Sequence, residues 1–269
     1  MVLPIGAAER GRVAPPPAPR DCQTCQGAPA HAIERERVVS DRNFAGIRVC
    51  VFDAYGTLFD FASAAAGCAE ILGDRAAALT RLWRDKQLQY TWLRVGQGRH
   101  ADFLQVTGDA LDFALEALQL REVGLRERLM KLYLTLDAFP EVPAVLRALK
   151  AAGLGTAILS NGTPAMLKAA VANAGLGEVV DPVLSVEEVG VYKPHPTVYQ
   201  LAVDRLALAP AAILFVSSNA WDVHAASAFG LRTVWCNRYG QARERLPGAP
   251  DREVGSLAEL PGLVGLINA

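Results

Sequence analysis

The clearest indication of how this 269-residue chain folds is the sequence Ile47-Arg48-Val49-Cys50-Val51-Phe52-Asp53-Ala54-Tyr55-Gly56-Thr57-Leu58-Phe59-Asp60. The run before Asp53 is rich in β-branched and apolar side chains, which predicts a short buried strand. Asp53 ends this strand, and Gly56 allows the chain to turn tightly just afterwards. We therefore expect the strand to present a carboxylate, beside exposed backbone N–H groups, at its carboxyl end.

Runs of the same texture recur along the chain, at residues 155–159, 182–186, 213–216 and 232–236. Helical patterns lie between them, at residues 143–152, 164–174, 196–206 and 222–229. Strands that alternate with short helices predict a parallel sheet covered by helices on both faces. The predicted fold class is α/β, with a doubly wound, Rossmann-like parallel sheet as its core.

The segment from about Ala62 to Leu136 interrupts this alternation, because its apolar residues follow a helical period throughout. Examples with acidic residues on the opposite side are Leu104, Leu111, Leu115 and Leu118. The segment predicts an all-helical cap domain, inserted into the α/β core and facing the active site across a cleft.

One helix of this cap, near residues 79–95, has two apolar stripes. The first contains Leu79, Leu82, Trp83, Tyr90 and Leu93, and the second contains Leu88, Trp92 and Val95. A helix that is apolar on two sides is expected to lie between two partners. Arg84 falls on the second stripe, where a buried cation needs an anionic partner.

The predicted domains are a disordered tail at 1–45, an α/β catalytic core at 46–61 and 137–269, and a helical cap at 62–136. The tail has a Pro-rich stretch at 13–20 and shows no sustained periodicity, so it cannot bury enough apolar surface to fold. Cys22 and Cys25 form a lone C-x-x-C pair, which lacks the further ligands of a zinc site and is interpreted as two reduced thiols. Cys50 and Cys236 are interpreted as core residues.

Composition excludes several classes of function. The chain is 51% hydrophobic and 20% charged with a formal net charge of −1, which is ordinary for a globular enzyme and gives no basic surface for nucleic acid. No apolar run is long enough to cross a bilayer. Charged residues interrupt the N-terminal apolar stretch where a signal peptide would continue, so we expect a soluble, cytoplasmic protein.

Polar residues follow the predicted strands, where ligands bind in open α/β sheets. Asp53 ends the first strand, and Ser160 and Asn161 end the second. Lys193 precedes the helix that begins near Pro196. The strand at 213–216 is followed by Ser217-Ser218-Asn219-Ala220-Trp221-Asp222. Each residue also has a simpler interpretation: Asp53, Ser160 and Asp222 as caps or turn residues, Lys193 as a surface lysine. Trp221 is expected to pack.

In this order, the segments resemble the haloacid dehalogenase superfamily, whose members carry a nucleophile loop, a Ser/Thr loop, a lysine and an acidic loop. The resemblance spans about residues 47–260 and includes the helical insertion. Most phosphatases of the superfamily carry Asp-x-Asp in the first loop, whereas the second position here is Tyr55. The similarity is closer to the L-2-haloacid dehalogenases (type II), over residues 53–60, 82–88, 90–94 and 217–222.

The resemblance implies hydrolysis of short L-2-haloalkanoic acids, that is (S)-2-haloacid dehalogenase activity, giving 2-hydroxy acids. Asp53 would attack C2 and expel halide, and water would then hydrolyse the resulting ester with the help of Asp222 and Lys193. The implied catalytic residues are Asp53, Lys193, Asp222, Ser217, Asn219 and Thr57. Ser217 and Asn219 would hold Lys193 and Asp222 in place.

The implied substrate-binding residues are Ala54, Tyr55, Arg84, Leu88, Phe103, Ser160, Asn161 and Tyr199. Ser160 and the backbone of the first loop would hold the substrate carboxylate, and Arg84 with Asn161 would receive the halide. Tyr55, Leu88 and Phe103 would form an apolar lining, although all three could be plain packing residues, and Arg84 could instead pair with a core carboxylate. The histidines His100, His195 and His224 are not assigned to the site, because the family pattern needs none.

The resemblance implies no cofactor, no metal, and a homodimer formed through cap helices. The alternative is a Mg²⁺-dependent phosphatase of the same superfamily, for which Tyr55 is a poor replacement of the general acid. A non-catalytic protein on this fold would be expected to lack Asp53, Lys193 or Asp222, and all three are present. The sequence departs from the family at Gly96 and Gly98, where we expect a more mobile cap and a wider pocket.

Overall fold

The computed structural model describes residues 44–61, 63 and 67–266. Within them the strands form a six-stranded sheet in the order β3-β2-β1-β4-β5-β6, and every neighbouring pair is parallel. The strands are β1 Val49–Phe52, β2 Gly155–Ser160, β3 Val183–Ser185, β4 Ile213–Ser217, β5 Arg232–Cys236 and β6 Arg252–Val254. This confirms the predicted α/β fold with a doubly wound parallel sheet.

Strand β1 lies between β2 and β4, with Val49 beside both Gly155 and Ile213. Each of its residues is buried, as the continuous apolar run predicts for a strand covered on both faces. Strand β6 was not predicted from the sequence. It is a short edge strand in which Val254 alone is buried, so its pattern resembles that of a loop.

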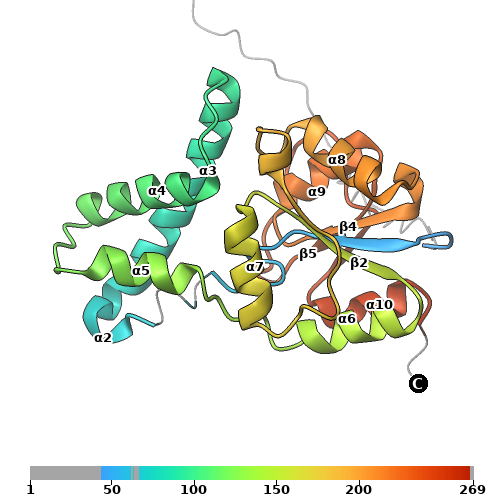
Figure 1. Ribbon diagram of the computed structural model, residues 1–269, viewed down its shortest axis with the longest axis horizontal. Coiled ribbons are helices and arrows are strands. Elements are labelled where there is room, and N and C mark those ends of the chain that lie inside the picture. The colour runs from blue at the N-terminus through green and yellow to red at the C-terminus, as the bar shows by residue number, and fades with distance from the viewer. Residues whose placement is uncertain (1–43, 62, 64–66, 267–269) are drawn as a thin grey trace, which may run out of the picture. The chain divides into compact units, whose positions relative to one another are not determined.

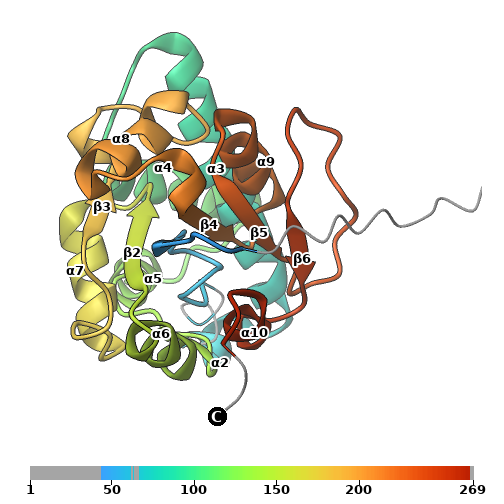
Figure 2. The ribbon, with the colours of Figure 1, turned by 90° about the vertical axis from the view of Figure 1, so that its right-hand side faces the viewer.

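The helices of the core are α6 Val142–Ala151, α7 Pro164–Asn173, α8 Pro196–Leu206, α9 Ala220–Phe229 and the short α10 Leu260–Leu263. In Figures 1 and 2, α6 and α10 lie on one side of the sheet and α8 and α9 lie on the other. Proline in the first turn of α6, α7 and α8 fits the fixed backbone angle needed there. Because all neighbouring strands are parallel, their polar carboxyl ends meet at one edge of the sheet.

The insertion between β1 and α6 is helical, as predicted. It contains α2 Ala69–Leu72, α3 Ala76–Gln97, α4 Phe103–Ala117 and α5 Leu125–Tyr133. The buried side of α3 differs from the two predicted apolar stripes, because it is a single row of Leu79, Trp83, Gln87 and Thr91. Leu93 is 52% exposed and Trp92 is 40% exposed, although the Trp92 ring contacts Trp221 edge to face at 5.5 Å.

Gly98 ends α3 in the left-handed conformation with φ of +62°, and Gly96 lies in the last helical turn. A Cβ atom added at either position would meet no atom of the described residues within 4 Å. A side chain here would therefore begin in open space, and the wider pocket stays a prediction.

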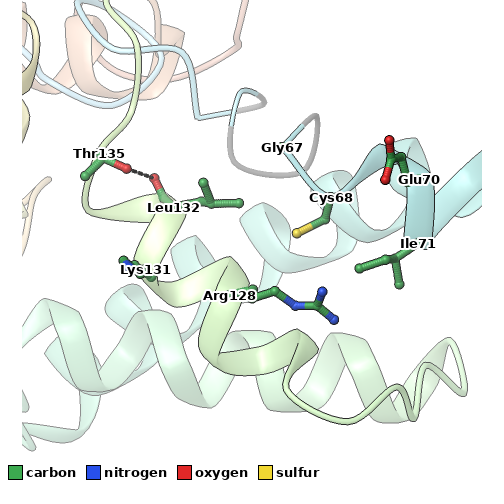
Figure 3. Close-up of a pocket in the computed structure, with 8 residues that line it drawn as sticks. All are labelled: Gly67, Cys68, Glu70, Ile71, Arg128, Lys131, Leu132 and Thr135. Atoms are coloured by element: carbon green, nitrogen blue, oxygen red, sulfur yellow. Dashed lines mark hydrogen bonds between the residues drawn. The ribbon is translucent and has the colours of Figure 1, made fainter.

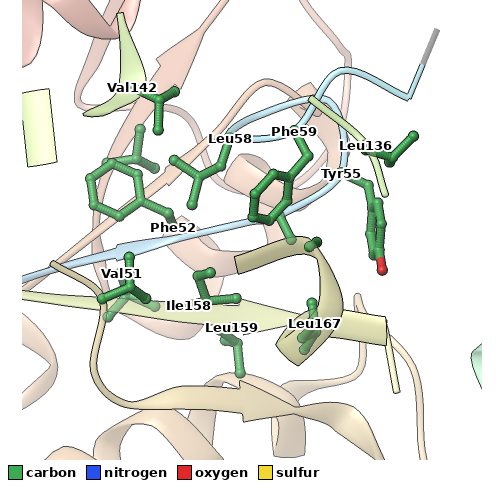
Figure 4. Packing of buried hydrophobic residues seen from close by; sticks show 14 of the residues in the cluster. Val51, Phe52, Tyr55, Leu58, Phe59, Leu136, Val142, Ile158, Leu159 and Leu167 are labelled. Atoms are coloured by element: carbon green, nitrogen blue, oxygen red, sulfur yellow. The ribbon is translucent and has the colours of Figure 1, made fainter. Parts of the chain in front are cut away.

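The core is formed by apolar side chains of all six strands and of the helices packed against them. Figure 4 shows this packing around Val51, Phe52, Leu58, Ile158 and Leu159. Cys50 and Cys236 are fully buried, and burial raises the pKa of the Cys50 thiol to about 12, as expected of core cysteines.

Phe44 is 4% exposed and lies 5.0 Å from the Arg232 guanidinium, so packed structure begins before the predicted core boundary at residue 46. Residues 1–43 of the predicted tail, with Cys22 and Cys25, lie outside the described residues. In the part of the chain that the structure describes, none of the helices combines the length and the apolar character that a membrane span requires.

Candidate active site

Asp53 follows β1 directly and is 6% exposed. Its backbone N–H donates to the carbonyl oxygen of Val216 in β4, which fixes the residue at the carboxyl edge of the sheet. The loop then turns at Gly56, whose φ of +86° strongly favours glycine. The N–H groups of Leu58 and Phe59 both donate to the carbonyl of Ala54, so the loop around the carboxylate is tightly closed.

Three side chains hold the Asp53 carboxylate. Thr57 Oγ1 donates to Oδ2 at 3.1 Å, and Asn219 Nδ2 donates to the same oxygen at 2.9 Å. Lys193 Nζ donates to Oδ1 at 3.2 Å. These three donors fix the orientation of the Asp53 carboxylate.

Lys193 lies between two carboxylates, because its Nζ also donates to Asp222 Oδ2 at 2.8 Å. Lys193 is 1% exposed and Asp222 is fully buried. Burial disfavours the ammonium, but Asp222 and Asp53 outweigh it and hold the pKa of Lys193 above its ordinary value. The pair of carboxylates therefore shares one firmly protonated lysine.

Tyr199 was expected to contact substrate, but it is fully buried beneath Asp222. Its hydroxyl donates to Asp222 Oδ1 at 2.7 Å. Burial raises the pKa of Tyr199 well above its ordinary value, so the phenol stays a hydrogen-bond donor. The structure therefore corrects this expectation: the Tyr199 hydroxyl is bonded to Asp222, and its side chain is closed off from solvent.

The loop after β2 contacts the backbone of Lys193. Asn161 Oδ1 accepts a hydrogen bond from the Lys193 N–H at 3.1 Å, and Ser160 Oγ accepts from Gly162 N at 3.2 Å. Gly162 has no room for a side chain, since a Cβ atom there would lie 2.9 Å from the Tyr55 ring. The cap of α7 is Thr163, which accepts from Met166 N, so the alternative role of Ser160 as that cap is excluded.

The loop after β4 joins the nucleophile loop. Ser217 Oγ accepts from Asn219 N at 3.1 Å, and Thr57 Oγ1 accepts from Ser218 N at 2.9 Å. Asn219 occupies the N-cap position of α9 without a side-chain capping hydrogen bond, and Asp222 lies inside that helix. The interpretation of Asp222 as an ordinary helix cap is therefore wrong.

Arg84 reaches this group from helix α3 of the cap. Its Nη2 donates to Asn219 Oδ1 at 3.4 Å and its Nη1 donates to Gln87 Oε1 at 2.7 Å. Its guanidinium also lies 5.3 Å from the centre of the Phe61 ring. The Tyr133 hydroxyl is a further hydrogen-bond partner of Arg84. None of these partners from the described residues is a carboxylate, so the alternative of a core carboxylate partner is not what the structure contains.

Aromatic rings form the apolar side of the site. The Tyr55 ring is stacked on Tyr133 at 5.4 Å and lies 5.6 Å from Phe103. Burial raises the pKa of Tyr55 well above its ordinary value, so this residue stays neutral. Leu88 is half-buried on α3, one turn after Arg84.

The unassigned histidines have structural partners instead. His100 pairs with Glu187 at 2.9 Å, His195 caps α8, and His224 Nδ1 lies 3.3 Å from the Leu246 carbonyl oxygen. Among the described residues, no group of three or more His, Cys, Asp or Glu side chains is arranged to hold a metal ion.

Gln87 and Tyr133 contact Arg84 and Tyr55 but were not predicted as site residues. The signal in the sequence is weak: Gln87 is a polar residue on the buried row of α3, where an apolar one is expected.

The structure also contains a cavity of about 680 Å³ away from Asp53, beside α2 and α5 (Figure 3). Its lining residues are Gly67, Cys68, Glu70, Ile71, Arg128, Lys131, Leu132 and Thr135, and they include no predicted site residue.

Comparison with known proteins shows which family this chain resembles. Residues 47–230 match the family model of the haloacid dehalogenase-like hydrolases. The chain is 48% identical over 219 residues to (S)-2-haloacid dehalogenase 1 of Pseudomonas sp. (strain CBS-3), covering 81% of this chain and 96% of that protein. It is 46% identical over 215 residues to (S)-2-haloacid dehalogenase 4A of Burkholderia cepacia, covering 80% and 93%.

A solved structure extends the similarity to three dimensions. It is that of the L-2-haloacid dehalogenase from Xanthobacter autotrophicus with chloropropionic acid covalently bound. The two chains superpose with a TM-score of 0.76 at 39% identity, covering 82% of this chain and all of that one (100%). The similarity spans both the sheet and the helical insertion.

Proposed function

This chain belongs to the haloacid dehalogenase-like hydrolases, in the group of the (S)-2-haloacid dehalogenases, and on that basis we propose that it hydrolyses short L-2-haloalkanoic acids to 2-hydroxy acids. The observation that carries the proposal is the buried Asp53 carboxylate, held by one lysine and two neutral donors. Tyr55 stands where a phosphatase of the superfamily would carry its second aspartate.

In the first half-reaction, a carboxylate oxygen of Asp53 attacks C2 of the substrate. The new C–O bond is an ester, and the carbon–halogen bond breaks as the halide leaves with its electron pair. Thr57, Asn219 and Lys193 keep the carboxylate oriented for in-line attack. Arg84 and Asn161 are proposed to receive the halide, since a developing anion needs donors already in place.

In the second half-reaction, water attacks the carbonyl carbon of the Asp53 ester. Asp222 accepts one proton of that water, and the C–O bond to the substrate oxygen breaks. This oxygen takes up the second water proton as the 2-hydroxy acid leaves, the Asp53 carboxylate is restored, and Asp222 releases its proton to solvent. Lys193 lies beside both carboxylates and stabilises the negative charge that develops on the ester oxygen. The water oxygen stays on Asp53, and an original Asp53 oxygen leaves in the product.

The remaining residues are proposed to bind substrate or to position the catalytic groups. Ser160 and the backbone N–H groups of Ala54 and Tyr55 would hold the substrate carboxylate, and Tyr55, Leu88 and Phe103 would line its alkyl side. Three residues have positioning roles supported by their hydrogen bonds, namely Ser217 to Asn219, Asn219 to Asp53 and Tyr199 to Asp222.

We also propose that the reaction needs no metal. Lys193 Nζ, within 3.2 Å of Asp53 and 2.8 Å of Asp222, supplies the positive charge that Mg²⁺ gives to the phosphatases. A 2-haloacid brings one carboxylate, held away from C2, whereas a phosphoryl group brings its charge directly onto the nucleophile.

The domain boundaries, a cytoplasmic location and a homodimer remain part of the proposal. We propose that residues 62–136 act as a cap over the core at 46–61 and 137–269. Support for pairing through the cap comes from apolar side chains exposed on α3 and α4, namely Trp92, Leu93, Leu104 and Phe113.

The test is halide release from L-2-chloropropionate by the full chain before and after exhaustive EDTA treatment. We expect equal rates, no turnover of the D enantiomer, and essentially none by Asp53→Ala. A single turnover in H₂¹⁸O should place the label in Asp53. A strict Mg²⁺ requirement, or faster phosphate release from a phosphate ester, would favour the phosphatase alternative, and label found first in the product would exclude the covalent mechanism.

A further inference from the structure

Gln87 occupies an unusual position on helix α3. The buried row of this helix consists of Leu79, Trp83, Gln87 and Thr91, and Gln87 is 1% exposed. A buried amide is costly unless its donors and acceptor are satisfied, so its hydrogen bonds define its orientation. One of those hydrogen bonds joins the amide oxygen of Gln87 to Arg84.

The orientation of the Gln87 amide is fixed by Thr107 of α4. The Thr107 hydroxyl donates its hydrogen to the Phe103 carbonyl at 2.6 Å. Its oxygen must therefore accept from Gln87, and Gln87 Nε2 lies 2.7 Å away. With the amide nitrogen committed to Thr107, the amide oxygen faces Arg84 Nη1 at 2.7 Å. The direction of each bond follows from the one before it.

Tyr133 closes the same network from α5. Its hydroxyl lies 3.0 Å from Gln87 Nε2 and 3.3 Å from Gln87 Oε1. Its ring is stacked on Tyr55, two residues after the nucleophile. Helices α3, α4 and α5 thus converge on one amide beside the catalytic loop.

The neutral charge of Gln87 matters as much as its position beside Arg84. A glutamate at residue 87 would form a salt bridge with Arg84 and neutralise the guanidinium. Gln87 accepts a hydrogen bond without carrying charge, and so does Asn219 on the other side of Arg84. The guanidinium is therefore held firmly while its positive charge remains available to an anion.

We propose that Gln87, itself oriented by Thr107 and Tyr133, is a positioning residue that directs Arg84 toward the departing halide. The proposal rests on the proposed dehalogenase function. Gln87 touches neither the nucleophile nor the reacting carbon, so its effect should be felt through Arg84 and should depend on the leaving group.

The test compares Gln87→Met with Gln89→Met, an identical substitution at an exposed glutamine of the same helix. Single-turnover ester formation is measured with L-2-chloropropionate and L-2-bromopropionate, together with inhibition by added chloride and bromide. We expect Gln87→Met to slow the chloride substrate roughly 10-fold, less than the ~10²–10³-fold loss of an entire donor. The bromide substrate, with its better leaving group, should slow less, and halide inhibition should weaken. Gln89→Met should match the unmodified enzyme.

Two further variants keep the proposal testable if Gln87→Met does not fold. Thr107→Val removes the group that orients Gln87 and should change the chloride-to-bromide ratio in the same direction, by a smaller factor. Gln87→Glu places a carboxylate beside Arg84 and should weaken halide inhibition more than Gln87→Met does.

An unchanged ratio and unchanged halide inhibition in the folded variants, with an active unmodified enzyme, would overturn the role of Gln87 and leave the proposed function intact. Absence of halide release by the unmodified chain would instead overturn both.

Discussion

The charge of the site is set by Lys193 and its two carboxylate neighbours, Asp53 and Asp222. One ammonium between two carboxylates leaves an excess negative charge, and a bound 2-haloacid would add another. Arg84, whose described hydrogen-bond partners are neutral groups, is the cation placed to offset that excess. Lys193 alone would therefore not balance the negative charge of the site once an anionic substrate is bound.

Tyr199→Phe should change the pH dependence of turnover. Burial and the nearby charge of Asp53 raise the pKa of Asp222, whereas Lys193 and the hydrogen bond from Tyr199 lower it. The net effect is a pKa above the ordinary value of an aspartate. Asp222 must be ionised to accept a proton from water, so activity is present above its pKa and is lost as pH falls through it. Removing the hydroxyl should raise that pKa further and move the acid limb of kcat to higher pH.

The measurement is a kcat profile through the acid range with a good substrate. Tyr239→Phe is the control, because Tyr239 is 61% exposed and lies outside the site. An acid limb that stays in place, or moves to lower pH, in Tyr199→Phe would show that this hydroxyl does not tune Asp222.

At the scale of elements, the start of α4 is joined to the core by Glu187. Its carboxylate accepts from the Phe103 N–H at 3.3 Å and pairs with His100 at 2.9 Å, while Asp102 caps the same helix. A negative charge at a helix N-terminus is favourable because the exposed N–H groups there carry partial positive charge. This contact fixes the end of the insertion nearest to Tyr192 and Lys193.

Glu187→Gln should therefore destabilise the protein by up to about 1 kcal/mol. The neighbouring Glu188→Gln is the matched control, because its pair with Arg205 is largely exposed and should contribute less than about 0.5 kcal/mol. Urea denaturation of both variants measures the difference. Equal free energies of unfolding would mean that Glu187 does not hold the cap.

The elements that the sequence predicted well are those with a strong period. Strand β1 and helix α8 have continuous or clearly periodic apolar runs, and the polar groups at strand ends follow from the geometry of parallel sheets. Strand β6 was not predicted, and the buried row of α3 was wrongly predicted as two apolar stripes. Their burial is decided by neighbours far along the chain, and a polar Gln87 in a buried row has no local signature.

Among the site residues, Tyr199 shows the same limit. Its presence near the site was inferred by resemblance, but its contact with Asp222 depends on how α8 and α9 pack against each other. The orientation of a side chain between two helices is a tertiary property, and a single sequence does not contain it.

In the molecule as a whole, the first residue that the structure describes, Phe44, is already packed against the core. Phe44 is buried against Arg232 of β5. Deleting residues 1–43 should therefore leave the melting temperature and halide release nearly unchanged. Phe44→Ala in the full chain should cost roughly 1.5–3 kcal/mol of stability, the contribution of one buried aromatic side chain.

Thermal unfolding of the deletion, the substitution and the unmodified chain compares the three directly. A deletion that melts several degrees lower would mean that residues before Phe44 pack on the core. A Phe44→Ala variant as stable as the unmodified chain would mean that the contact with Arg232 contributes little.

The separation of Asp53 from its partners has a consequence for how the protein is made. Lys193 follows Asp53 by 140 residues and Asn219 follows it by 166. At about 5–20 residues per second, a ribosome needs roughly 10–30 s to pass from the nucleophile to the amide that holds it. Until residue 217 has been synthesised, β4 is incomplete and one edge of β1 stays unpaired in the nascent chain. We expect the nascent chain to be most prone to wrong strand pairing during that interval.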